Sequence, residues 1–510
     1  MPAPVTQFKS DARRVAADLR HRGIIQTAMQ KYEVVRDQRK LWFQDWQGAR
    51  DLAARTKFEA IAHLDQHLAE FVAKLEARGT KVHWASTSAQ AREIIFGILR
   101  EKNARVVVKS KTMTSEEIHL NDAMEQAGYE VVESDLGEFI VQLRHEAPYH
   151  LVFPAMHLTR GDIKETFEKK LQDASIIALS MNRVAQSVSA ASCGSVPLPV
   201  ATPGGTPGQL AGEDACATRI LTDNPEELTM VARRVLREKY LQAEVGITGA
   251  NFAIAETGMI SITENEGNAR LTAALPKTMI SLVGIEKILP RMADLALFLP
   301  MLAVMGTGQA LTCYNTMYGG PRQPGECDGP EEFHVVLLDN QRTALLADAE
   351  QRDALGCIRC GACLNVCPIF RNVGGHTYAT TYGGPIGSVI TPHLRGLTQW
   401  KHLSDASSLC GACTETCPVK IDLHHHLLQN RRNGARVKPS WLQKIAFKIY
   451  ALVANRPKLW SVATKVVRVG MKLRGLVNES VLDHARPWTK TRDLPPMAKQ
   501  SFREWWKERK

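Results

Sequence analysis

The sequence contains no long apolar segment. Its longest apolar run, residues 295–305, covers 11 residues and includes Pro300, whereas crossing a bilayer takes about 20 residues. The run therefore predicts a buried core segment. The N-terminal residues lack the apolar centre of a signal peptide. We expect a cytoplasmic protein. Peripheral contact with the inner face of the membrane is possible only through the C-terminal tail.

The G-x-G-x-x-G turn that binds dinucleotides is also missing. A flavin is compatible with redox chemistry, but the sequence does not support one. Cysteines are sparse outside one short region, since seven of the 11 lie between Cys357 and Cys417. Without an export signal, such a cluster favours metal binding over a disulfide framework. We expect the other four to be ordinary packed or loop residues: Cys193, Cys216, Cys313 and Cys327.

At 510 residues the chain is too long for a single core. We expect a helical region (1–75), an α/β domain (76–345), a cysteine-rich domain (346–432) and a helical tail (433–510). In the α/β domain, strands alternating with helices predict a largely parallel sheet. Its predicted strands include residues 81–86, 104–111, 129–134, 149–156 and 332–339. A stretch rich in Ala, Ser, Gly and Pro, 173–219, is predicted to be an insertion.

The C-terminal tail carries the basic character of the chain. Residues 421–510 hold 20 Lys and Arg against 6 Asp and Glu, a net charge of +14 in a chain of +11. Apolar residues recur there at helical spacing, and five of the nine tryptophans lie there: Trp441, Trp460, Trp488, Trp505 and Trp506. We favour docking on a partner or on the protein itself over membrane contact. No recognition module accompanies the charge, so we expect no nucleic-acid binding.

The cysteine region contains two similar motifs, "CIRCGACLNVCPI" (357–369) and "SSLCGACTETCPV" (407–419). In two-cluster ferredoxins, the fourth cysteine of such a run ligates the other cluster. This crossover predicts a first [4Fe–4S] cluster on Cys357, Cys360, Cys363 and Cys417. It predicts a second cluster on Cys367, Cys410 and Cys413. A zinc site and free thiols are the alternatives, but zinc sites usually pair two short doublets.

The second predicted cluster lacks one thiolate because Ser407 stands where the first motif has Cys357. Ser407 could ligate through its hydroxyl, although an alcohol is a harder and weaker donor than a thiolate. Alternatively, Cys313 or Cys327 could supply the fourth thiolate. The cluster could also be [3Fe–4S], or its fourth iron could bind water or a small ligand. His376 and His393 are candidate nitrogen ligands, although packed or exposed roles are commoner for histidine.

In the α/β domain the residues are less decisive. Lys109, Ser110, Lys111 and Thr112 follow a predicted strand and precede a helix, which is where α/β folds bind anions. A surface turn with a capping hydroxyl is the alternative. Other polar candidates carry no mark of catalysis: His150, His157, Glu256, Glu264 and Glu266. Glycines that permit a close backbone approach include Gly246, Gly249, Gly258 and Gly267.

Four stretches of this domain, residues 106–121, 133–143, 148–157 and 246–268, resemble the lactate-utilisation (LUD) domain. With both cysteine motifs and the closing "FREWWKERK", the chain from about residue 40 to 510 resembles the iron–sulfur LUD subunit of the bacterial L-lactate oxidation complex. The resemblance implies a Rossmann-like sheet of the isomerase and CoA-transferase type beside a helical ferredoxin-type domain. That family also assigns three cysteines to the second cluster. The insertion at 173–219 departs from the pattern.

The resemblance also implies two partner subunits, a cysteine-rich protein of heterodisulfide-reductase type and a smaller LUD protein. Together they would oxidise L-lactate to pyruvate, with this chain relaying electrons through two clusters. The catalytic centre could lie in a partner. One alternative is a relay for another oxidoreductase, of glycolate or heterodisulfide type. Another is a redox-sensing protein whose LUD domain binds a regulatory ligand.

Overall fold

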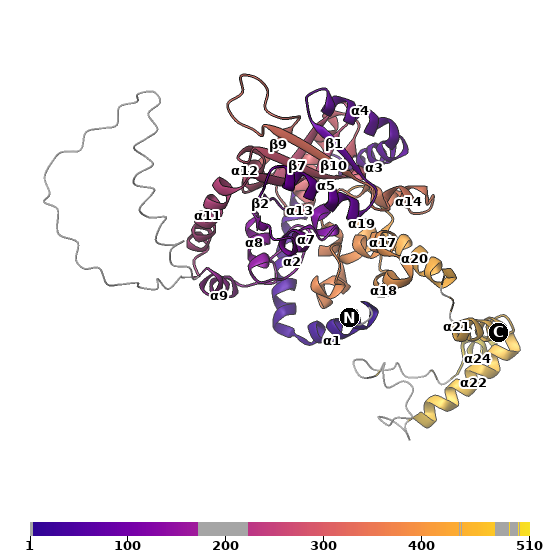
Figure 1. Cartoon of the computed structure of the whole chain (residues 1–510). Helices are drawn as coiled ribbons and strands as arrows, with labels where there is room; N and C mark the ends of the chain where they lie inside the picture. Colours follow the sequence, from indigo (N-terminus) through magenta and orange to yellow (C-terminus); the bar gives the residue numbers. More distant parts are fainter. Residues whose placement is uncertain are drawn as a thin grey trace, which may run out of the picture. The chain divides into compact units, whose positions relative to one another are not determined.

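The structure, a computed structural model, describes residues 4–171, 223–437, 441–474 and 500–509, with the single residues 439, 489 and 498 (Figure 1). The chain forms two compact units, Met1–Asn433 and Gly434–Lys510. The predicted insertion at 173–219, with Cys193 and Cys216, lies outside the described residues, as does Trp488.

The first unit is built on a six-stranded sheet in the order β1-β10-β7-β4-β2-β3, with every neighbouring pair parallel. This confirms the predicted α/β class. The strands are β1 (Lys81–Ala85), β2 (Val106–Lys109), β3 (Glu130–Glu133), β4 (Val245–Gly249), β7 (Thr278–Gly284) and β10 (Glu332–Leu338). The last strand in the chain, β10, lies between β1 and β7, so the sheet joins distant parts of the sequence.

Both faces of this sheet are covered, because alternate side chains of a strand point to opposite sides. In β10, Val336 and Leu338 pack with helices of one face, whereas Val335 and Leu337 pack with those of the other. The first face carries α5 (Ser88–Glu101) and α7 (Leu120–Gln126), and the second carries α4 (Leu64–Glu76) and α12 (Asn268–Ala274). A further layer packs on β2 and β3: α8 (Leu136–Leu143), α9 (Arg160–Lys170) and α11 (Pro225–Gln242).

A smaller sheet adjoins the second face, with strand order β8-β5-β6-β9. Its strands are β5 (Phe252–Ile254), β6 (Met259–Glu264), β8 (Ile288–Leu289) and β9 (Tyr314–Tyr318). The apolar run 295–305 falls in helix α13 (Leu295–Thr307), where Phe298, Met301 and Met305 are fully buried. The prediction of a core segment is thus confirmed.

One predicted strand is wrong. Residues 149–156 form bends and turns instead of a strand. The Tyr149 N–H donates to the Pro154 carbonyl at 2.9 Å, so the segment closes on itself. Pro154 has no N–H to give to a ladder, and apolar side chains such as Leu151 are buried by neighbouring elements. An apolar composition alone therefore did not distinguish a packed loop from a strand.

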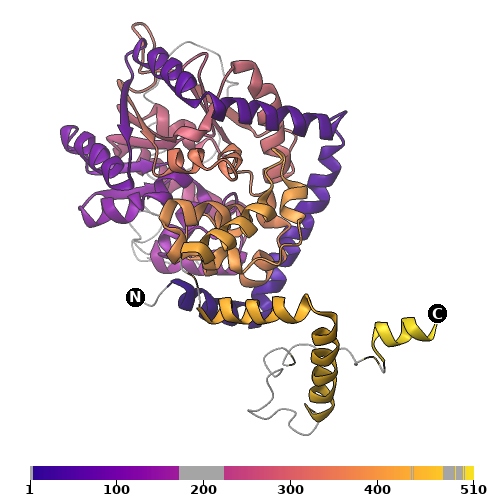
Figure 2. The same ribbon diagram turned by 90° about the vertical axis from the view of Figure 1, so that its right-hand side faces the viewer.

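The N-terminal helices cover the cysteine-rich part of the first unit. They are α1 (Pro4–Ala17), α2 (Leu19–Lys40) and α3 (Trp46–Ala62). Figure 2 shows them in indigo and purple along the side of the orange helices. The Phe8 ring contacts the Tyr378 and His402 rings, with centroids 5.9 and 5.6 Å away. Glu33 forms an ion pair with Arg371 at 2.6 Å.

Short helices separated by tight loops make up the cysteine-rich part. They are α15 (Ala362–Asn365), α16 (Pro368–Val373), α17 (Gly384–Arg395), α18 (Leu397–Asp405), α19 (Ala412–Thr416) and α20 (Leu423–Val437). Its core is continuous with that of the larger sheet region, since Cys360 and Cys363 share one buried cluster with Phe298 and Leu289.

The second unit contains α21 (Trp441–Ala454), α22 (Pro457–Arg474) and α24 (Phe502–Glu508). The Tyr450 and Trp460 rings of α21 and α22 meet edge to face, 6.4 Å apart. Many apolar side chains of α21 remain exposed: Trp441, Leu442, Ile445, Phe447, Ile449 and Leu452. Among the described helices, none has the length and apolar character needed to cross a membrane.

Candidate functional site

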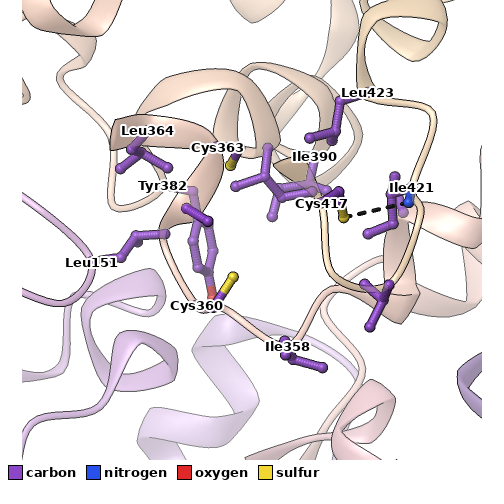
Figure 3. Packing of buried hydrophobic residues seen from close by; sticks show 14 of the residues in the cluster. Leu151, Ile358, Cys360, Cys363, Leu364, Tyr382, Ile390, Cys417, Ile421 and Leu423 are labelled. Atoms are coloured by element: carbon purple, nitrogen blue, oxygen red, sulfur yellow. Dashed lines mark hydrogen bonds between the residues drawn. The ribbon is translucent and has the colours of Figure 1, made fainter. Parts of the chain in front are cut away.

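Four cysteines from both motifs line one small hollow. Its walls include Cys357, Cys360, Cys363 and Cys417, together with apolar side chains such as Ile386 and Ile421. Figure 3 shows the sulfur atoms of Cys360, Cys363 and Cys417 pointing into a common space, with Tyr382 beside them. The Ile421 N–H donates to Cys417 Sγ at 3.4 Å. The set joins three cysteines of the first motif with the last cysteine of the second.

The other three cysteines form a second group beside the first. Cys367 lies close enough to Cys410 for their charges to interact, and Cys413 lies similarly close to both. Cys413 is also near Cys363 of the first group. Cys410 is exposed, whereas Cys413 is buried. The second group is therefore the one that reaches the surface.

Ser407 occupies the same local position in its motif as Cys357 does in the first. The Arg359 N–H donates to Cys357 Sγ at 3.4 Å, and the Leu409 N–H donates to Ser407 Oγ at 3.1 Å. Both donors have a left-handed backbone, with φ of 60° at Arg359 and 55° at Leu409. The two loops thus share one local backbone conformation, with the Ser407 hydroxyl standing where the first motif has the Cys357 thiol.

The burial of these cysteines determines how acidic their thiols are. It raises the pKa of Cys413 to about 11 and that of Cys417 to about 12. Free thiols of this kind stay protonated at neutral pH and make poor nucleophiles. A metal that binds thiolate would displace the protons. Seven soft donors converging in two adjacent groups fit iron–sulfur clusters. The buried Cys413 and Cys417 do not fit reactive thiols.

Arginines of the N-terminal helices hold the second motif in place. Arg50 of α3 donates from Nε to the Cys417 carbonyl at 3.0 Å and from Nη2 to the Thr414 carbonyl at 3.5 Å. Arg36 of α2 donates to Thr416 Oγ1 at 3.4 Å. Sequence reasoning missed both residues, because nothing in a helical surface pattern marks an arginine that contacts a loop more than 360 residues away.

A buried network of charges joins the sheet region to the first cysteine loop. Arg342 donates two hydrogen bonds to Glu117, at 2.9 and 2.8 Å, and a third from Nε to Glu286 at 2.5 Å. Glu286 also accepts from Arg359 at 3.2 Å. The Tyr382 hydroxyl donates to Glu117 at 2.7 Å. The facing arginines lower the pKa of Glu286 to about 2 despite its burial.

The predicted anion-binding residues separate into two sets. Lys109 is buried, and its ammonium donates to Ser115 and pairs with Glu116 and Glu133, the latter at 2.6 Å. Ser110, Lys111 and Thr112 instead line a cavity at the end of β2. Gly249 of β4 makes room for Thr112, since a Cβ there would lie 2.2 Å from its hydroxyl.

That cavity also contains two basic residues that sequence reasoning missed, Lys287 and Arg359. Lys57 of α3 holds the backbone on either side of Lys287 by donating to the Glu286 carbonyl at 2.7 Å and the Ile288 carbonyl at 3.1 Å. A comparison of the two motifs could have drawn attention to Arg359, because the second motif has Leu409 there.

The other candidates lie elsewhere or have partners already. His376 lies beside His157 and Glu146, and its Nε2 contacts the Ala147 carbonyl at 2.8 Å. His393 has Asp348 and His426 as charged neighbours. His150 is buried, and its Nδ1 accepts from the Val152 N–H. Among the described residues, none of these histidines forms a hydrogen bond with a cysteine sulfur.

The acidic candidates bind helix or turn N–H groups. Glu256 accepts from the Met292 N–H at 2.7 Å, and Glu264 accepts from the Ala269 N–H at 2.6 Å. Glu266 accepts from the Leu136 N–H at 3.1 Å. Glu264 and Glu266 both line the cavity. Cys313 and Cys327 are exposed in the loops on either side of β9, outside both cysteine groups.

Comparison with known proteins gives three consecutive family matches. Residues 68–338 match the LUD domain, residues 353–421 a 4Fe-4S dicluster domain, and residues 424–510 the C-terminal domain of lactate utilisation protein B. The Lactate utilization protein B of Bacillus velezensis is 38% identical over 96% of this chain and 94% of its own length. The protein of the same name from Oceanobacillus iheyensis is 40% identical over 91% of this chain and 88% of its own length. The one from Shouchella clausii is 41% identical over 91% of this chain and 89% of its own length.

Proposed function

The chain belongs to the lactate utilization protein B family, and from this we propose that it is the iron–sulfur electron-transfer subunit of an L-lactate-oxidising complex. Converting L-lactate to pyruvate releases two electrons and two protons. Iron–sulfur clusters accept and release single electrons, so two adjacent clusters would together carry the pair. The observation that supports this most is the convergence of Cys417 with three cysteines of the first motif on one hollow.

In this proposal the chain supplies ligands and insulation. Cys357, Cys360, Cys363 and Cys417 would hold the first cluster, and Cys367, Cys410 and Cys413 the second. Buried apolar side chains around the first group keep water away. The exposed Cys410 puts the second group nearest the surface, and this suits electron exchange with another protein.

The test is anaerobic purification followed by iron and sulfide analysis and EPR of the oxidised and reduced protein. We expect about seven or eight irons per chain, with comparable sulfide. With the partner subunits present, L-lactate should reduce the clusters within one turnover. Zinc without sulfide, or reduction by glycolate but not by L-lactate, would contradict the proposal.

The fourth corner of the second cluster can be tested by changing Ser407 to cysteine. Because Ser407 Oγ occupies the position of Cys357 Sγ in the repeated loop, a thiol there should complete a four-thiolate site. We expect Ser407→Cys to keep about eight irons after mild oxidation, whereas the natural protein falls to about seven with a [3Fe–4S] EPR signal. The matched control is Ser408→Cys at the exposed neighbouring position. Equal iron loss in all three proteins would refute the assignment.

We also propose the partner subunits that the family resemblance implies, a heterodisulfide-reductase-type protein and a smaller LUD protein. The exposed apolar side chains of α21 and the basic charge of the tail support a docking role. Co-purification of the tagged full chain with both subunits would test this. Sedimentation with anionic vesicles in their place would indicate membrane contact instead.

A further inference from the structure

A cavity of about 320 Å³ opens at the carboxyl edge of the six-stranded sheet. Residues that follow four of the parallel strands line it: 110–112 after β2, Asp135 after β3, 250–251 after β4 and Lys287 after β7. Open α/β sheets bind ligands at this edge. The volume lies at the lower end of the range for small-molecule sites, so a ligand of a few heavy atoms would fit.

Three hydrogen-bond donors in this cavity lack an acceptor among the described residues. Ser110 Oγ and Arg359 Nη1 are both buried without a hydrogen-bond partner, and the Arg359 side chain is only 9% exposed. Lys287 forms no hydrogen bond or ion pair within the described chain. Leaving the two buried donors, on Ser110 and Arg359, without an acceptor is costly in free energy. Two cations and a hydroxyl together favour an anion as the missing acceptor.

The lining of the cavity also includes acidic residues. Asp135, Glu264 and Glu266 line it, and Glu264 is already occupied by two backbone N–H groups of α12. Glu266 accepts only the Leu136 N–H among its described hydrogen bonds. Burial of its carboxylate and the nearby Asp135 raise the pKa of Glu266 to about 7. A carboxylate of this kind can accept a hydrogen bond from a ligand hydroxyl.

Arg359 connects the cavity to the first cysteine group. Among the described residues, it alone lines both the cavity and the hollow of the four cysteines. Its left-handed backbone, unusual for a long side chain, is held by the Glu286 ion pair and by stacking on Tyr382, with 4.7 Å between the guanidinium carbon and the ring centroid. An anion bound to Arg359 would be held by the residue next to Cys360 and two positions after Cys357.

We propose that this cavity binds a small 2-hydroxycarboxylate, with its carboxylate on Ser110, Lys287 and Arg359 and its hydroxyl directed to Glu266. The substrate class rests on the proposed function, whereas the location rests on the unpaired donors and the cavity. The chain would then hold the substrate anion beside the first cluster as well as carry electrons.

The test is equilibrium dialysis of labelled L-lactate against the anaerobically purified full chain with its clusters intact. We expect one saturable site, competed by pyruvate and much less by inorganic phosphate. Lys287→Met should weaken binding about tenfold or more, because it removes a charged donor. Ser110→Ala should weaken it about threefold to tenfold. Lys277→Met, at an exposed lysine outside the cavity, is the control and should bind normally.

Iron content and EPR of each variant must match those of the natural protein, so that the loss of binding reflects the cavity. In the natural protein, L-lactate should also shift the EPR spectrum of the first cluster, and Lys287→Met should reduce that shift. No saturable binding, equal competition by phosphate, or unchanged affinity in Lys287→Met would overturn the proposal. If the clusters relay electrons but this chain binds no lactate, only the cavity proposal fails. If the purified chain contains no iron–sulfur clusters and still binds lactate, only the electron-transfer proposal fails.

Discussion

Cys417→Ala should remove the first cluster and leave the second in place, so that iron falls by about four atoms per chain. The structure places Cys417 at the hollow of Cys357, Cys360 and Cys363, although it belongs to the second motif. Cys357→Ala should therefore have the same effect. EPR of the reduced protein should show one remaining cluster with the same spectrum in both variants.

Cys367→Ala should have the opposite effect, removing the second cluster and leaving the first. Cys367 belongs to the first motif but lies beside Cys410 and Cys413, so its loss should affect the second cluster and spare the first. Cys313→Ala, at an exposed cysteine outside both groups, is the matched control and should keep full iron content. If Cys417→Ala and Cys410→Ala lost the same cluster, each motif would bind its own cluster and the crossover would be wrong.

Arg342→Met should lower the free energy of unfolding by about 3–5 kcal/mol, since it removes one partner from a buried ion-pair network. Arg342 is 1% exposed and bonds both Glu117 and Glu286. Without it, two buried carboxylates lose their main counter-charge. Glu286 also orients Arg359, so the first cluster should be lost earlier during unfolding.

Anaerobic urea unfolding, followed by circular dichroism and by cluster absorbance, measures this effect. Lys81→Met is the matched control, because the Lys81 pair with Glu332 is largely exposed and should contribute less than about 1 kcal/mol. If the two variants differed from the natural protein by similar amounts, the network would not stabilise this fold.

The pH dependence of the Arg342 effect follows from Glu286. Its pKa in the folded protein, about 2, lies below the ordinary value of 4.5, so the ionised form stabilises the fold above pH 4.5. This contribution is lost as the pH falls from 4.5 towards 2. In Arg342→Met, Glu117 and Glu286 stay buried without their main counter-charge, so their pKa values should rise and both groups should bind protons more readily as the pH falls from 7 to 5. The stability difference between Arg342→Met and the natural protein should therefore shrink over that interval, and a constant difference would contradict this assignment.

Much of the fold could be predicted from local patterns. The two cysteine motifs predicted metal binding because ligand spacing within a tight loop is a local property. Strands such as β1, β2 and β10 were predicted because β-rich runs between helices have a recognisable period and length. The apolar run in α13 was identified as core because it is too short for a membrane. The segment 149–156 was not, since an apolar loop and a short strand have the same composition.

Local sequence patterns were enough to predict the α/β class, the pair of cysteine motifs and the absence of a thiolate at Ser407. They could not predict which polar residues contact one another. In the folded protein, Lys109 pairs with Glu133 and Arg50 binds the Cys417 loop. Ser110, Lys287 and Arg359 line one cavity. The reason is physical: spacing along a loop or helix depends on local backbone geometry, whereas contacts between distant residues depend on strand order and on the packing of helices from other parts of the chain.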